Sequence, residues 1–169
     1  LRLQRSVRCR KKPLMLTGDA VAVGVTNEEQ VHSARVGKMG LIGTLMALSG
    51  RGDEALQYAQ RLSEQSPPLT SGTFVADGVK YIRALIALER GDEVVALSEL
   101  ESMQFNVNYL FVNDWGFFDR VDARFRLAEL LDRAGRQDDA LRWFDSIIED
   151  GTFLVAPAHM RAAEILDAL

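Results

Sequence analysis

Apolar residues along this chain recur at the three- and four-residue spacing that places side chains on one face of an α-helix. The segments with this pattern lie near 26–49, 53–65, 74–89, 92–103, 117–133, 137–149 and 157–169. Together they cover nearly two thirds of the chain, whereas about one third is usual for globular proteins. The pattern therefore predicts an all-α protein.

One turn sequence occurs three times between these segments. Each copy consists of a glycine, four further residues and an alanine, at 50–55, 91–96 and 135–140. Glycine is typical of a helix end, and the acidic residues after it favour the start of the next helix. Because an internal period of about 20–50 residues is typical of helical repeat proteins, we predict three antiparallel helical hairpins and a final single helix. The expected repeats are 36–73, 77–116, 120–152 and a partial repeat at 156–169.

The residues around these turns resemble the tetratricopeptide repeat (TPR) pattern, in which small and large residues alternate at fixed places on two helices. The matching residues are Met39, Ile42, Gly43, Met46, Ala55, Ala59 and Pro67 in the first repeat, Ala84, Ala87, Ala96 and Leu100 in the second, and Leu127, Ala128, Leu131, Ala140 and Phe144 in the third. The resemblance implies a TPR-like α-solenoid over residues 26–169. The arrangement is also similar to the repeat regions that follow kinase or DNA-binding domains in some large bacterial regulators.

In TPR-like arrays the first helices of successive repeats line a concave groove, so the resemblance implies a set of groove residues. They are Tyr81, Leu85, Asp122, Phe125, Glu129, Asp132, Met160, Glu164 and Asp167. The carboxylates make the C-terminal half of this groove acidic, which would suit a basic or amphipathic peptide. The alternative is that these carboxylates are ordinary solvated positions, partly paired with Arg126, Arg133 and Arg161 at helical spacing.

Two other groups of residues have packing explanations. Gly37, Gly40 and Gly43 recur every three residues, and on a helix they would permit close contact with a neighbouring helix at some cost in helix propensity. The densest aromatic stretch consists of Phe105, Tyr109, Phe111, Trp115, Phe117 and Phe118. These rings are expected to pack over the hairpins, and the alternative is a binding surface at the edge of the array.

The charge is unevenly distributed. The formal net charge is −4, but residues 1–12 carry six basic groups and no acidic one, so the remaining 157 residues carry 14 basic and 24 acidic groups, a balance of −10. We therefore expect a basic, irregular segment at 1–25 and an acidic body that does not bind nucleic acid. No apolar run approaches the roughly 18 residues of a membrane span. The single cysteine, Cys9, excludes an intramolecular disulfide and fits a reducing compartment, so the expected location is cytoplasmic.

Residues for catalysis or metal binding do not group together in the sequence. The two histidines, His32 and His159, are 127 residues apart, and neither has neighbours at metal-ligand spacing. The sequence also lacks a phosphate-binding glycine loop or a nucleophile motif. We therefore expect neither an enzyme nor a bound metal or cofactor.

The expected function is non-catalytic binding of a protein or peptide. The alternative is a regulatory or sensor arm of a larger signalling kinase or transcription regulator, of which this chain would be a fragment. An uncapped last repeat would leave an apolar face open and favour a homodimer.

Overall fold

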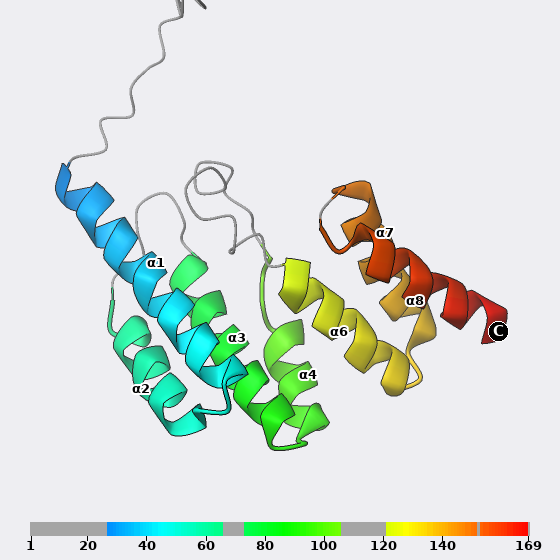
Figure 1. Ribbon diagram of the computed structural model, residues 1–169, viewed down its shortest axis with the longest axis horizontal. Coiled ribbons are helices and arrows are strands. Elements are labelled where there is room, and N and C mark those ends of the chain that lie inside the picture. The colour runs from blue at the N-terminus through cyan, green and yellow to red at the C-terminus, as the bar shows by residue number, and fades with distance from the viewer. Residues whose placement is uncertain (1–26, 66–72, 106–120, 152, 169) are drawn as a thin grey trace, which may run out of the picture.

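The computed structural model describes residues 27–65, 73–105, 121–151 and 153–168, and every regular element in these ranges is a helix. The helices are α1 (Asn27–Leu48), α2 (Gly52–Ser63), α3 (Phe74–Glu89), α4 (Glu93–Glu101), α6 (Val121–Arg133), α7 (Gln137–Glu149) and α8 (Val155–Ala168). Helices α1 and α2, α3 and α4, and α6 and α7 pack as neighbouring pairs, and α8 packs against α7 (Figure 1). The prediction of an all-α repeat fold with three hairpins and a final helix is confirmed. The predicted basic segment at 1–25 lies outside these ranges.

The three repeated turns share one backbone geometry. Gly50, Gly91 and Gly135 have φ angles of 73°, 74° and 75°, in the left-handed region that favours glycine. At the third turn the Arg136 N–H donates to the Leu131 carbonyl oxygen at 2.9 Å, and the Gly135 N–H donates to the Asp132 carbonyl oxygen at 2.9 Å. The same pair of bonds closes the other two turns, which is the Schellman arrangement of a helix C-terminus.

The alanine of each turn explains why a small residue recurs there. Ala55, Ala96 and Ala140 each lie in the first turn of the second helix of their hairpin and are completely buried. A side chain no larger than a methyl group lets the two helices of a hairpin come close together. The repeated turn is therefore a packing unit as well as a helix stop.

The last helix begins earlier than the sequence pattern predicted. Pro157 was expected to open it, but α8 starts at Val155, and the Ala158 N–H already donates to the Leu154 carbonyl oxygen at 2.9 Å. The first N–H groups of a helix have no partner within it, so proline is accepted anywhere in the first turn.

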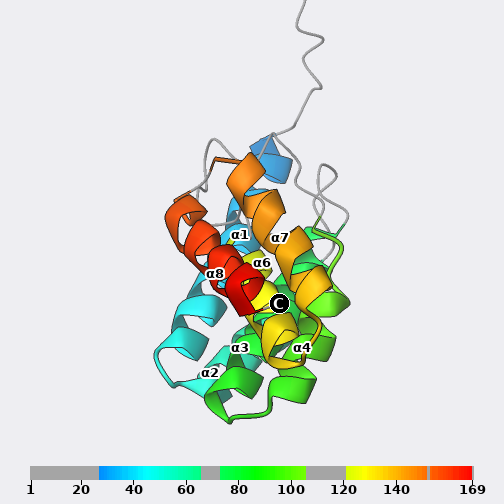
Figure 2. The same cartoon turned by 90° about the vertical axis from the view of Figure 1, so that its right-hand side faces the viewer.

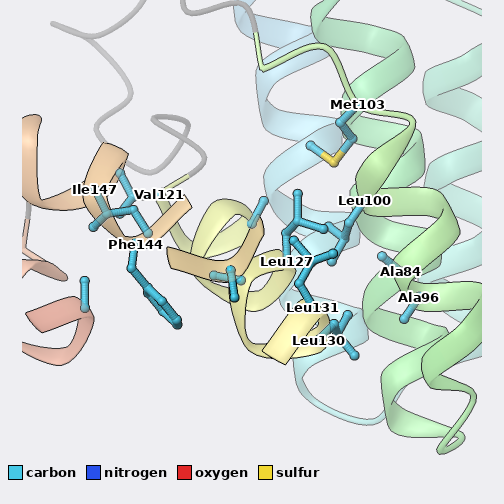
Figure 3. Close-up of a cluster of buried hydrophobic side chains, with 14 of the residues drawn as sticks. Ala84, Ala96, Leu100, Met103, Val121, Leu127, Leu130, Leu131, Phe144 and Ile147 are labelled. Carbon is cyan, nitrogen blue, oxygen red and sulfur yellow. The ribbon is translucent and has the colours of Figure 1, made fainter. Parts of the chain in front are cut away.

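The buried apolar side chains form two clusters that meet at α3. The first joins α1, α2 and α3 and includes Val36, Ala59, Leu62 and Ile82. The second joins α3 to α4, α6, α7 and α8 (Figure 3). Tyr81 is half-buried and packs against both clusters. Helix α3 is therefore the shared wall of two cores.

Close approach of α1 to the next hairpin depends on Gly43. A Cβ atom added at Gly43 would lie 2.5 Å from Cδ1 of Ile82 on α3 and 3.1 Å from Cβ of Tyr58 on α2. Real Cβ atoms essentially never lie within 3.0 Å of such an atom, so the contact with Ile82 would force a shift. The expectation that this glycine permits close helix contact is therefore confirmed.

The two junctions between hairpins differ. Helix α3 packs against both α1 and α2, whereas α6 packs against α4 of the preceding hairpin. Ion pairs reinforce the second junction, since Arg133 of α6 bonds Glu93 at 2.9 Å and Arg136 bonds Glu101 at 2.6 Å. Figure 2 views the array from the end formed by α7 and α8.

Part of the aromatic stretch can be placed. The ring of Phe105, directly after α4, packs on Trp143 of α7 with ring centroids 4.9 Å apart. Asp77, which is buried on α3, accepts a hydrogen bond from the Gln104 N–H at 3.1 Å. This bond fixes the position of Gln104, the residue directly before Phe105. The prediction of packing is therefore confirmed for Phe105. The other five aromatic residues, at 109–118, lie outside the described ranges.

Candidate functional site

One face of α6 carries four of the predicted site residues in a row. Asp122, Phe125, Glu129 and Asp132 follow the three-, four- and three-residue spacing of one helix face, and all four are partly buried. The opposite face of α6 contributes Leu127 to the second core cluster. We call this row the α6 stripe.

The N-terminal end of the α6 stripe is tied to α3. The hydroxyl of Tyr81 donates a hydrogen bond to Oδ2 of Asp122, and Nε of Arg126 donates to the same oxygen at 3.1 Å. Burial, and then the negative charge of Asp122, raise the pKa of Tyr81 far above its usual value near 10.0. The phenol therefore stays protonated and remains a donor to the carboxylate.

The C-terminal end of the stripe is tied to α8. Nη2 of Arg161 on α8 donates to Oδ2 of Asp132 at 2.9 Å, and its Nη1 donates to Glu164 one turn further along the same helix. The Nε of Arg161 is buried and has no hydrogen-bond partner in the described ranges. One arginine thus holds the last helix against the end of α6.

The middle of the stripe has no such bridge. The ring of Phe125 packs edge-on against Phe144, with centroids 5.4 Å apart and an interplanar angle of 70°. Among the residues that the structure describes, the Glu129 carboxylate forms neither an ion pair nor a hydrogen bond. The stripe thus presents an aromatic ring and an unpaired carboxylate between two fixed ends.

The structure brings together six of the nine predicted site residues on α3, α6 and α8. They are Tyr81, Asp122, Phe125, Glu129, Asp132 and Glu164. Met160 and Asp167 lie exposed on α8, outside these contacts. Leu85 is only 4 % exposed and belongs to the first core cluster, so its expected place on a binding surface was wrong. Because α3 packs against both α1 and α2, the side of α3 that carries Leu85 faces the core.

The pairing of the acidic residues was predicted in part. Arg126 pairs with Asp122 and Arg161 with Glu164 at helical spacing, as the alternative interpretation expected. Arg133 instead reaches Glu93 on α4. The contacts of Tyr81 with Asp122 and of Arg161 with Asp132 were missed, because they join residues 41 and 29 positions apart.

These pairings reduce the negative charge of the surface. Four carboxylates (Asp122, Glu129, Asp132 and Glu164) meet two guanidinium groups (Arg126 and Arg161), so the net charge is 2 − 4 = −2. The surface is therefore mildly acidic, and of these four carboxylates only that of Glu129 has no arginine partner among the described residues.

Other kinds of site find little support in the part of the chain with assigned positions. Within it there is no group of three or more His, Cys, Asp or Glu side chains that could hold a metal ion. A shallow hollow on α1 is lined by Glu28, Val31, His32 and Arg35, all from one helix. No described helix combines the length and the apolar character needed to cross a membrane.

Comparisons with known proteins do not place this chain in a family. No family model matches it, and searches against curated proteins and solved structures find no match. The functional argument therefore depends on the α6 stripe and its surroundings.

Proposed function

We propose that this chain is a non-catalytic interaction module that binds a basic or amphipathic peptide across the α6 stripe. The observation that carries the proposal is the unpaired Glu129 carboxylate beside the partly buried Phe125 ring, between two ends fixed by hydrogen bonds. A cationic side chain of the peptide would pair with Glu129, and an apolar side chain would pack on Phe125.

The contacts at the two ends of the stripe favour such binding energetically. Tyr81 and Arg161 hold α3 and α8 against α6 before any partner arrives. A surface that is already ordered loses less conformational entropy when it binds. The exposed side chain of Met160 on α8 would extend the surface for a longer peptide.

We further propose that the array is TPR-like. The support is the repeated turn, with its buried alanines at 55, 96 and 140, and the packing of α3 against both helices of the first hairpin. A role as the regulatory or sensor arm of a larger signalling protein would use the same binding surface.

A displayed library of random peptides tests the proposal directly. The immobilised chain should enrich peptides that combine Lys or Arg with an apolar residue, and the variant Glu129→Lys should lose that enrichment at least tenfold. The matched control is Glu149→Lys, because Glu149 is exposed on α7 and the charge change is identical. Equal enrichment by the wild type and Glu129→Lys, with both chains folded, would show that the α6 stripe is not the binding surface.

A further inference from the structure

One face of the first helix is apolar, and in the part of the chain that the structure describes no helix packs on it. Val31, Leu45 and Leu48 are 55 %, 47 % and 51 % exposed. Together with Ala34, Lys38 and Leu41 they follow alternating three- and four-residue steps along one side of α1. We call this row the α1 stripe.

The opposite face of α1 is also apolar, since Val36 and Ala47 are buried in the first core cluster. A helix that is apolar on both sides is typical of a protein interior. The α1 stripe therefore has the composition of an interface.

The outer face of the last helix has the same spacing but smaller residues. Ala156, His159, Ala163 and Leu166 are all exposed and follow three-, four- and three-residue steps along α8. The other side of α8 carries Ala158, Ala162 and Ile165, which are buried in the second cluster. We call this exposed row the α8 stripe.

The two stripes complement each other in shape and in charge. The α1 stripe presents leucines around Lys38 and contains no carboxylate. The α8 stripe presents alanines and is flanked by Asp167, an exposed carboxylate without a partner among the described residues. In an antiparallel contact between two α1 stripes the two Lys38 side chains would lie about one helical turn apart and repel each other. The mixed contact instead places Lys38 beside a carboxylate.

We propose that the chain associates head to tail with a second copy of itself, with the α8 stripe of one copy on the α1 stripe of the next. In an antiparallel alignment two alanines face leucines, Ala163 opposite Leu41 and Ala156 opposite Leu48. His159 then lies opposite Leu45, and Leu166 lies opposite the aliphatic part of Lys38. The same alignment places Asp167 beside Lys38.

The positions of the two stripes decide the kind of assembly. Helices α1 and α8 lie at opposite ends of the array (Figure 1). A contact between two different surfaces at opposite ends leaves one of each free on every dimer, so association continues to longer chains. Because the contact is one helix against one helix, it is smaller than the roughly 1,600 Å² of a standard interface, and we expect association at micromolar concentrations or above.

The decisive experiment blocks one stripe at a time in the full chain. Sedimentation velocity of the wild type should show a mass that rises with concentration beyond the dimer. Leu45→Asp blocks only the α1 stripe, and Ala163→Arg blocks only the α8 stripe. Each variant alone should be monomeric where the wild type associates, and an equal mixture of the two should form dimers and nothing larger.

Matched controls separate this contact from general effects of charge. Val94→Asp changes a valine that is 80 % exposed on α4 and should associate like the wild type. Lys38→Asp and Asp167→Lys should each weaken association at least tenfold, and the two changes combined in one chain should restore it. Glu129→Lys should have no effect, so the result is independent of the peptide-binding proposal.

The alternative arrangements give different outcomes. If Ala163→Arg alone still dimerised, two α1 stripes would be in contact, and if Leu45→Asp alone still dimerised, two α8 stripes would be. Either result would overturn the proposal. A wild type that stays monomeric up to millimolar concentration would overturn it as well.

Discussion

Replacing Gly43 by alanine tests whether α1 lies as close to its neighbours as the structure places it. The new Cβ would meet Cδ1 of Ile82 at 2.5 Å and Cβ of Tyr58 at 3.1 Å. Ile82 is completely buried, so its side chain has little room to move away. We expect Gly43→Ala to destabilise the protein although alanine is the better helix former.

The magnitude follows from two opposing contributions. Alanine in a helix interior is favoured over glycine by about 0.5–1 kcal/mol, and overpacking a core costs about 1–3 kcal/mol. The net loss for Gly43→Ala should thus lie between about 0 and 2.5 kcal/mol. At Gly52 the nearest atom to an added Cβ is Oε2 of Glu89 at 3.4 Å, which is an ordinary contact. Gly52→Ala is therefore the matched control and should be neutral or stabilising.

A double-mutant cycle identifies the clashing atom. Ile82→Val removes Cδ1 and alone should cost about 0.5–1.5 kcal/mol. In the Gly43→Ala background the same change relieves the clash, so its cost should be smaller by about 1 kcal/mol, a coupling typical of residues in contact. Urea unfolding followed by circular dichroism measures all four chains and gives each free energy by linear extrapolation. Additive effects of the two substitutions, or a Gly43→Ala variant as stable as Gly52→Ala, would refute the close approach.

Three further perturbations have defined outcomes. Gly135→Ala should lower the free energy of unfolding, measured in urea, by about 1–2 kcal/mol. The cause is the positive φ angle alone, since an added Cβ meets nothing within 4 Å. Gly135→Asn should cost less, because asparagine tolerates a positive φ better than alanine. Asp150→Ala should destabilise the protein more than Arg124→Met does, because Arg124 is buried, pairs with Asp150 at 2.7 Å and would be left as an unpaired charge. Thermal melting measures both variants, and the reverse order of stability would show that the pair contributes nothing. The raised pKa of Tyr81 means that the unfolded chain ionises first, so this tyrosine's contribution to stability is complete below about pH 10 and is lost as the pH rises further. Tyr81→Phe should reduce the loss of stability above about pH 10. If the free energy of unfolding of the variant depended on pH as that of the wild type does, Tyr81 would not be the buried phenol that causes this loss.

Local signals predicted the fold well. A glycine followed by acidic residues defines a helix end and a helix start within six positions, so the three turns could be found without knowledge of any partner helix. The left-handed φ angles of Gly50, Gly91 and Gly135 confirm that interpretation. The start of α8 was misplaced because proline is compatible with several positions of a first helical turn.

The candidate site was less predictable because it depends on how helices face one another. Spacing alone treats Tyr81 and Leu85 as neighbours on one face of α3, yet Tyr81 reaches Asp122 and Leu85 lies in the core. Spacing also predicted that Arg161 pairs with Glu164, but not that it reaches Asp132 on another helix. Contacts between residues 29 or 41 positions apart leave no local pattern in a single sequence.

The division of the core at α3 has a consequence for the chain during its synthesis. Every member of the first cluster lies between Val36 and Ile86, whereas the second cluster extends to Ile165. The first core can therefore close before the 165 − 86 = 79 residues that complete the second cluster have been translated. At about 5–20 residues per second that interval lasts about 4–16 s. During it the side of α3 that carries Ala84 and Ala87 is still exposed, so the ribosome-bound intermediate already offers the template on which α4 and α6 dock.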